Sequence, residues 1–348
     1  MKKITILIFL FSQMFLFSQN IQWEFHFFYY PSIDSLVSFR GIFAVDKNTV
    51  WVSGSKGSVY VTYDEAKSWQ REEIPAGDSL DFRDIEVISP GTIILMSAGA
   101  GKNSRIYKST DNGKTWKIVY QNPYPDGFLD SIEFWDHKNG IAIGDPLDGK
   151  FNILLTTDGG NVWKEPLKKN IPDSFHGEAQ FAASGTCISV IGNREAWIGT
   201  GGTKSRILKT TDNGKSWKVF ASPLLQGKSS TGIFSIHFLN RNEGIIVGGD
   251  YLKEKSSDST SAFSHDGGKT WKLNPAGTLP YQSSVESFKF NNQIFYISTG
   301  PVGTFYTKDL KNWYKIGRTG FHCISISKKD NSIWFAGSNG RIARLTIN

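Results

Sequence analysis

Four carboxylates are the side chains best suited to chemistry in this 348-residue chain: Asp84, Glu178, Asp250 and Glu286. Two carboxyl groups about 5 to 9 Å apart can divide the acid, base or nucleophile roles that glycoside cleavage requires. We pair Asp84 with Glu178 and Asp250 with Glu286 as the first candidates. Spacing along the chain does not give the separation of either pair.

A wider polar set accompanies these acids and favours binding. Its members stand where repeated strands are predicted to begin, or in one adjoining glycine-rich loop: Arg40, Arg83, Asp84, Asp130, Glu178, Ser184, Asp250, Tyr251 and His322. Charges of both signs that converge on one mouth predict contact with a protein or glycan partner. The alternative is that Arg83 and Asp84 form ion pairs between neighbouring units and close the space between them.

Motifs for cofactor chemistry are missing from the sequence. There is no Gly-x-Gly-x-x-Gly before a helix, no phosphate loop, no Cys/His ligand spacing and no nucleophile elbow, so we predict no cofactor and no metal. His322 could act as a base, but its position between Phe321 and Cys323 favours a packed, hydrogen-bonded residue. The formal charge of +7 comes from lysines and arginines interspersed with acids, which does not favour a nucleic-acid surface.

A repeated phrase defines the elements that must position these residues. The copies are TYDEAKSW (62–69), STDNGKTW (109–116), TTDGGNVW (156–163), TTDNGKSW (210–217), SHDGGKTW (264–271) and the shortened TKDLKNW (307–313). Their period of roughly 43–54 residues is typical of four-stranded propeller blades. We therefore predict an all-β, seven-bladed β-propeller whose blades each run strand a, strand b, strand c, the phrase as a turn, and strand d.

The seventh blade is predicted to be shared between the two ends of the chain. After the sixth phrase, residues 321–327, 332–337 and 340–346 read as only three strands. The fourth strand is predicted at residues 21–28, with Trp23 in the position of the tryptophan that ends each phrase. Pairing of this N-terminal strand with the C-terminal blade closes the ring and removes its free edges.

The phrase itself is interpreted as structural. Its aspartate accepts backbone hydrogen bonds in the turn, its glycine takes a left-handed conformation, and its tryptophan packs between blades. It lacks the repeated acids and distal glutamate of a calcium loop. Cys187 and Cys323 fall on inner strands across the axis from each other, which favours two buried free thiols over a disulfide.

The N-terminus reads as a secretory leader. Met1-Lys2-Lys3 precedes the apolar run 4–17, and cleavage is expected near Ser18. We assign 1–18 to a signal peptide and 19–348 to one propeller domain. The expected location is periplasmic or secreted, and no second apolar segment predicts a membrane span. We expect a monomer.

The repeated phrase and the segments GEAQFAASGT (177–186), GGDY (248–251) and GRIARL (340–345) resemble the Asp-box or BNR-repeat propellers, and among them the photosystem II assembly-factor-like group. The resemblance implies a propeller but no particular reaction. Sialidases share the phrase, but Ser38-Phe39-Arg40-Gly41-Ile42 departs from their arginine motif, and no arginine triad follows. Xyloglucanase-type enzymes need two propellers to form their cleft.

These features lead to one functional prediction and one alternative. We expect an exported, non-catalytic propeller that binds a protein or glycan through the face carrying the b–c turns and d–a connections, as in an assembly or maturation factor. The alternative is a glycoside hydrolase or lyase that uses the carboxylates at the channel mouth.

Overall fold

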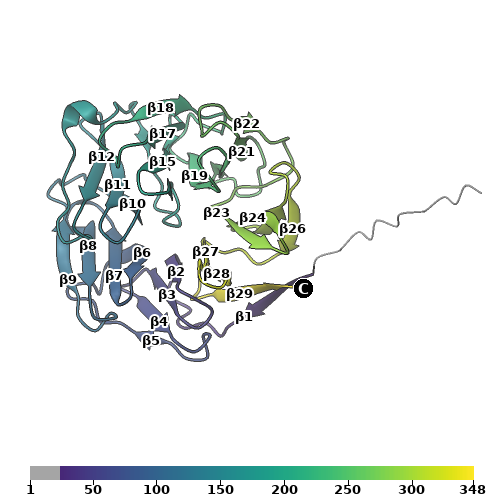
Figure 1. Ribbon diagram of the computed structural model, residues 1–348. Coiled ribbons are helices and arrows are strands. Elements are labelled where there is room, and N and C mark those ends of the chain that lie inside the picture. Colours follow the sequence, from purple (N-terminus) through teal and green to yellow (C-terminus); the bar gives the residue numbers. More distant parts are fainter. Residues whose placement is uncertain (1–23) are drawn as a thin grey trace, which may run out of the picture.

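Seven antiparallel sheets surround a common axis in the computed structural model, which describes residues 24–348 (Figure 1). The predicted leader and Trp23 lie outside the described residues. Within those residues the only helical elements are two short 3₁₀ turns, η1 (Gly101–Asn103) and η2 (Lys168–Asn170). The prediction of an all-β, seven-bladed propeller is confirmed.

Blades 1 to 3 follow one another along the chain, each with its first strand nearest the axis (Figure 1). Blade 1 contains β2 (Phe39–Ala44), β3 (Val50–Gly54), β4 (Val59–Thr62) and β5 (Gln70–Arg71). Blade 2 contains β6 (Asp81–Ser89), β7 (Thr92–Ala98), β8 (Arg105–Ser109) and β9 (Lys117–Gln121). Blade 3 contains β10 (Leu129–Phe134), β11 (Gly140–Leu147) and β12 (Lys150–Thr156), and its outer strand is reduced to a bridge between Leu155 and Lys164.

Blades 4 to 6 repeat this plan. Blade 4 contains β14 (Ile188–Ile191), β15 (Glu195–Gly199), β17 (Arg206–Thr210) and β18 (Lys218–Ala221). Blade 5 contains β19 (Thr231–Phe238), β20 (Gly244–Asp250), β21 (Ser261–Ser264) and β22 (Lys272–Leu273), and the two-residue strands β13 (Glu178–Ala179) and β16 (Gly201–Gly202) join its inner edge. Blade 6 contains β23 (Ser284–Phe290), β24 (Gln293–Gly300), β25 (Gly303–Thr307) and β26 (Tyr314–Gly317).

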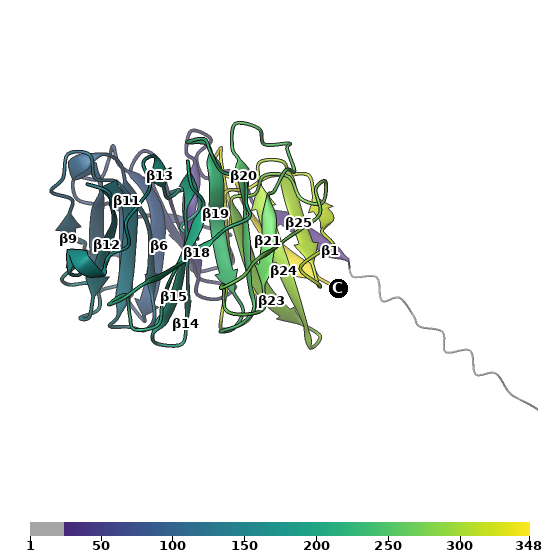
Figure 2. The ribbon, with the colours of Figure 1, turned by 90° about the horizontal axis from the view of Figure 1, so that it is seen from above.

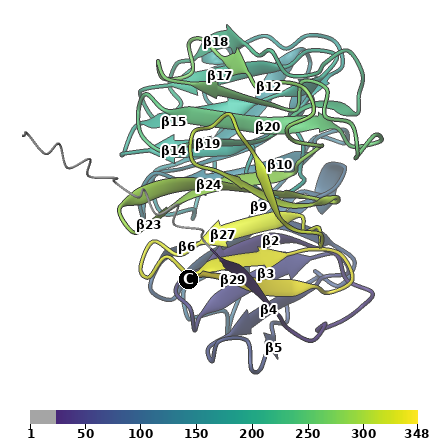
Figure 3. The same ribbon diagram turned by 90° about the vertical axis from the view of Figure 1, so that its right-hand side faces the viewer.

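Blade 7 closes the ring. It contains β27 (Cys323–Ile326), β28 (Ile333–Ala336) and β29 (Ile342–Ile347), and its outer strand is β1 (Phe25–Tyr29) from the other end of the chain. β1 lies antiparallel beside β29 (Figure 3), with Phe25 opposite Ile347 and Tyr29 opposite Ala343. Phe25 and Phe27 pack on the core between blades 6 and 7. The predicted closure is therefore present.

The core consists of apolar layers between neighbouring blades. One layer joins Trp51 of blade 1 to Phe82 and Trp116 of blade 2, and equivalent clusters continue around the ring. Branched and aromatic residues in short strands supply these layers, because both faces of each blade are buried. Cys187 and Cys323 are buried and free, as predicted.

The repeated Asp-box turns fasten strand c to strand d. In the box of blade 5, Asp266 accepts hydrogen bonds from the Ser264 hydroxyl (2.8 Å), the Thr270 amide (2.9 Å) and the Thr270 hydroxyl (2.7 Å). Gly268 takes a left-handed φ of +81°. Trp271 packs in the layer between blades 4 and 5. This geometry agrees with the structural role predicted for the phrase.

Asp266→Ala is expected to lower the free energy of unfolding by about 1–2 kcal/mol at pH 7, because the turn loses its central acceptor. Burial alone raises the pKa of Asp266, but the hydrogen bonds from Thr270, Ser264 and Lys269 outweigh it and lower the pKa to about 2. The carboxylate therefore stabilises the fold above the pKa of an unfolded aspartate, and this contribution is lost as the pH falls towards 2. Denaturant titrations at pH 7 and pH 3 should show a smaller difference between variant and wild type at pH 3. The exposed loop variant Asp126→Ala serves as the control, and an equal loss in both variants would contradict the fastening role.

Candidate functional site

A cavity of about 400 Å³ opens at one mouth of the central channel. Its walls come from the starts of inner strands, the d–a connections and the b–c loops, so we call this side of the ring the loop face and the side of the Asp-box turns the box face. In the edge-on view of Figure 2, the β20–β21 loop projects from one rim of the ring. Five of the predicted binding residues line this loop-face cavity: Arg40, Arg83, Asp130, Tyr251 and His322.

The floor of this cavity is made by residues 180–186, which we call the plug segment. Arg40 Nη1 donates to the Ala183 carbonyl (3.1 Å), and Arg83 Nη1 donates to the Ala182 carbonyl (2.8 Å). Gly185 accepts from Ser131 of blade 3 (2.6 Å). Further bonds join the plug segment to Ser235 of blade 5 and Ser283 at the start of blade 6, so the segment lies across the channel.

The plug segment shortens the strand that follows it. The inner strand of blade 4, β14, begins only at Ile188, two residues after the plug segment ends at Thr186. The Thr186 hydroxyl donates to the Ser235 hydroxyl (2.7 Å), and the Thr186 carbonyl accepts from the Ile236 amide (2.9 Å). These bonds to blade 5 replace the ladder within blade 4.

Arginine dominates one wall of the loop-face cavity. Arg83 is paired with Asp81 of its own strand through Nη2 and Oδ2, 2.7 Å apart. Burial, Arg40, Arg83 and Arg341 together lower the pKa of His322 to about 3, so the imidazole is neutral at pH 7. The backbone of His322 is hydrogen-bonded to Ala336 and Ser283. His322 is thus held as expected of a packed histidine, at the wall of the cavity.

Asp84 does not pair with Arg83, so that predicted ion pair is wrong. Its carboxylate accepts from the Ile85 amide (2.9 Å), the Ile132 amide (2.8 Å) and the Ser131 hydroxyl (3.2 Å). It ties blade 2 to blade 3 below the plug segment. Burial raises the pKa of Asp84 to about 8.

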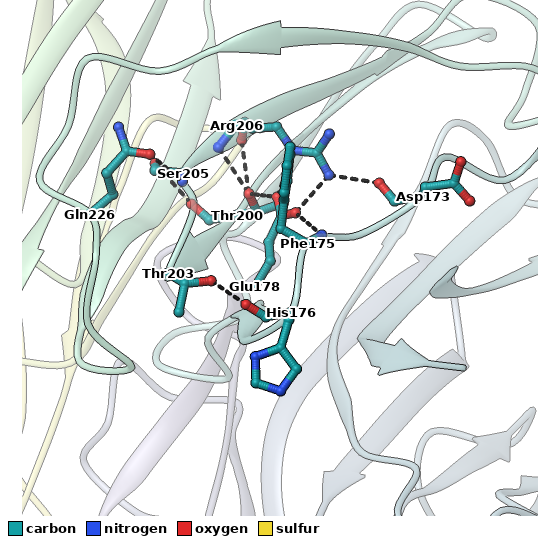
Figure 4. Close-up of polar contacts among 9 residues, drawn as sticks. All are labelled: Asp173, Phe175, His176, Glu178, Thr200, Thr203, Ser205, Arg206 and Gln226. Carbon is teal, nitrogen blue, oxygen red and sulfur yellow. Dashed lines mark hydrogen bonds and ion pairs between the residues drawn. The ribbon is translucent and has the colours of Figure 1, made fainter. Parts of the chain in front are cut away.

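The Glu178 carboxylate is surrounded by its own hydrogen-bond donors, and it is not brought together with Asp84. Arg206 Nε and Nη2 donate to the two Glu178 oxygens (2.9 and 2.6 Å), and Thr200 Oγ1 and the Phe175 amide also donate (2.7 and 3.0 Å). Figure 4 shows the contacts between Arg206 and Glu178, and the Arg206 guanidinium carbon also lies 4.7 Å from the centroid of the Phe175 ring. The Glu178 side chain is 0% exposed. It anchors the chain immediately before the plug segment.

The other predicted acid pair is not formed either. Asp250 is buried and caps its own turn by accepting from the Leu252 amide (3.0 Å). Glu286 lies at the box-face mouth, where its Oε2 is 3.2 Å from His237 Nδ1. Ser184 also lines the cavity at that mouth. The predictions for Glu286 and Ser184 placed them at the wrong end of the channel, because the plug segment divides it.

The box-face cavity has a volume of about 450 Å³ and an acidic wall. Asp84, Glu86, Glu133 and Glu286 line it together with Lys328. Burial raises the pKa of Glu133 to about 7, and Glu133 in turn raises the pKa of Lys328. Across residues 24–348, no group of three or more His, Cys, Asp or Glu side chains is arranged to hold a metal ion.

Sequence reasoning missed several residues of the loop-face cavity. Asp145 and Gln180 line it, as do the aromatic residues Phe181, Phe234 and Tyr281. Phe181 stacks on Phe234 with centroids 3.9 Å apart, and Tyr281 meets Phe234 edge-on at 4.8 Å. Nothing in the local sequence around these residues indicated which side chains face the channel.

Comparisons with known proteins agree with this architecture. A family model described as BNR/Asp-box repeat matches residues 107–117 and 262–273. No curated protein matches. Over the part of the chain that the structure describes, no helix is long and apolar enough to cross a membrane. The chain is a seven-bladed Asp-box β-propeller.

Solved structures with the same fold include three of different activity. The structure of YCF48 bound to D1 peptide matches with a TM-score of 0.61 and 13% identity, over 92% of this chain and 96% of that one. A catalytically inactive virginiamycin B lyase from Staphylococcus aureus with quinupristin has a TM-score of 0.61 and 17% identity over 93% and 99%. The GH74 xyloglucanase from Xanthomonas campestris has a TM-score of 0.56 and 11% identity, and this chain spans 56% of it. At these identities each of the three comparisons is a likeness of fold.

Proposed function

We propose that this chain is an exported, non-catalytic propeller that holds a segment of a partner protein in the loop-face cavity. One observation carries the proposal: the cavity is a pocket closed at its inner end by the plug segment. Aromatic rings line one wall, and Arg40 and Arg83 line another. Aromatic rings supply contact area at low entropic cost, and arginine donors suit peptide carbonyls and carboxylates. A rigid ring holds this pocket ready before a partner arrives.

The rim of the pocket supports a protein partner over a glycan. Tyr251 and Leu252 on the β20–β21 loop are 43% and 73% exposed, and Tyr251 packs edge-on against Phe234 at 6.1 Å. An apolar rim beside a lined pocket is typical of a protein-binding surface. YCF48, which shares the fold, is itself seen with a peptide.

Tyr251→Ala is expected to reduce capture of the partner from an exported fraction by roughly tenfold or more, as for an aromatic hot spot. The measurement is quantitative pull-down with the immobilised chain, followed by the dissociation constant of the captured partner. Tyr63→Ala is the matched control, because Tyr63 is 50% exposed on a box turn of the opposite face. An equal loss in both variants would remove the loop face from the proposal, and specific elution by a glycan would change the class of partner.

If the chain is instead a glycoside hydrolase or lyase, the structure offers it a different pair of acids from those predicted from the sequence. Neither pair predicted from the sequence is formed, whereas Asp130 and Asp145 lie together in the loop-face cavity. Turnover of a captured glycan by the wild type, lost in Asp145→Asn, would favour the enzyme over the binding protein.

A further inference from the structure

Asp130 and Asp145 are brought together by an irregularity in blade 3. The β10–β11 register shifts between Leu129 and Ser131, so Asp130 occupies a β-bulge. The Asp145 amide donates to the Phe128 carbonyl (3.0 Å), which sets Asp145 beside that bulge. The Gln180 amide of the plug segment then donates to Asp145 Oδ1 (3.1 Å). Asp130, Asp145 and Gln180 therefore line the loop-face cavity together.

Three buried atoms of this group lack a hydrogen-bond partner among the described residues: Asp130 Oδ2, Gln180 Oε1 and Gln180 Nε2. Asp130 is 2% exposed and Gln180 is 3% exposed, and both line the cavity. Buried polar atoms without partners are costly, so they are uncommon away from functional sites. Asp145 is only partly buried.

The acid pair also lacks a cationic partner from the protein. Within residues 24–348, neither Asp130 nor Asp145 forms an ion pair. Arg83, whose charge acts on Asp130, is already engaged by Asp81 and the Ala182 carbonyl. Phe128 and Phe181 line the same cavity and can offer ring faces to a cation.

We propose that Asp145, Asp130 and the Gln180 carboxamide form a subsite for an organic cation, the ammonium or guanidinium of a lysine or arginine side chain. This inference rests on the proposed function, since it assigns that side chain to the partner segment held in the cavity. Carboxylate and amide oxygens match the several donors of either cation. When the cation binds, it takes the place of a proton that the Asp130–Asp145 pair otherwise holds.

Binding at this subsite depends on pH because the Asp145 carboxyl group must be ionised. Burial raises the pKa of Asp145 to about 6, and burial together with the Asp145 charge raises the pKa of Asp130 well above its ordinary value. Arg83 opposes the shift at Asp130, and the nearby Cys187 thiol stays neutral because burial raises its pKa. Affinity for a cation therefore increases as the pH rises through about 6, where the competing proton leaves.

The test uses Nα-acetyl-arginine amide and Nα-acetyl-lysine amide as probes, with the neutral citrulline analogue as the matched ligand control. Calorimetric titration of the full mature chain at pH 7.5 should give a dissociation constant on the order of 1 mM for a cationic probe. Binding should weaken at least tenfold in Asp145→Asn and about tenfold for wild type at pH 5. Glu286→Gln removes a carboxylate from the box-face cavity instead and should leave probe binding unchanged.

Three outcomes would overturn the subsite: equal binding to Asp145→Asn, equal binding of the citrulline analogue, or binding of calcium but of neither cationic probe. Thermal unfolding of Asp145→Asn shows whether the variant is folded, and Gln180→Leu provides a second variant that keeps both acids. The result is separable from the proposed function. Partner capture that needs Tyr251 but not Asp145 would retain the function and reject the cation subsite.

Discussion

Glu178→Ala lowers the free energy of unfolding by about 3–5 kcal/mol, which is the expected result of removing one member of a buried ion pair. The side chain of Arg206 is only 14% exposed and would keep its charge with no carboxylate beside it. Thr200 Oγ1 and the Phe175 amide would lose the same acceptor. Because Glu178 lies two residues before the start of the plug segment, the floor of the loop-face cavity should also become mobile.

Denaturant titration measures the stability, and hydrogen exchange at residues 180–186 measures the loosening of the plug segment. Lys329→Ala is the control, since it breaks the exposed Lys329–Asp46 pair, in which Lys329 is 71% exposed, and should change the stability far less than Glu178→Ala does. The double variant Glu178→Ala/Arg206→Ala should recover part of the loss, because no unpaired charge remains. If Glu178→Ala behaved like Lys329→Ala, the anchoring role would be wrong.

Gly185→Ala should cost about 3 kcal/mol and displace the plug segment, through backbone strain and steric overlap together. Gly185 has a φ of +71°, and an added Cβ would lie 2.5 Å from Asp84 Oδ1 and 2.6 Å from Asp84 Cγ. The Asp84 carboxylate cannot move aside easily, because Ile85, Ile132 and Ser131 all hydrogen-bond to it.

Gly149→Ala separates the two causes. Gly149 has a similar φ of +75°, but nothing lies within 4 Å of an added Cβ, so only the strain of about 1–2 kcal/mol applies. Unfolding free energies of both variants, measured beside the wild type, give the steric part by difference. Partner capture should fall for Gly185→Ala and not for Gly149→Ala. Equal losses of stability would show that Asp84 does not confine the plug segment.

Much of the architecture was predictable because it is repeated. Each Asp-box places an acceptor, a left-handed turn and a tryptophan in a local sequence, so six copies predict the turns, the strands around them and the period of the ring. The closure by β1 followed from counting strands at the two ends of the chain. The loop-face residues Arg40, Arg83, Asp130 and His322 were also grouped correctly, because the starts of inner strands meet at one mouth in any propeller. Tyr251 joins them from the neighbouring β20–β21 loop.

The errors in predicting the site residues have one cause, which is the path of a single irregular segment. Residues 180–186 leave the blade pattern and cross the channel, so Ser184 and Glu286 line the box-face cavity and not the loop-face cavity. The repeated phrase gives no sign of this crossing. Glu178 is directed into an ion pair with Arg206, 28 positions away in the sequence, and not towards the mouth. Gln180 and Asp145 meet only because the plug segment passes beside the bulge in blade 3.

The sequence by itself determined the fold, the number of blades and the face on which irregular loops gather, because those properties come from local turns and alternating strands repeated many times. Only the tertiary structure decided which acids are free, which are enclosed and which share a cavity. Whether a carboxylate can bind a partner depends on burial and on contacts between distant segments. Those contacts occur once in the molecule, so no repetition in the sequence reports them.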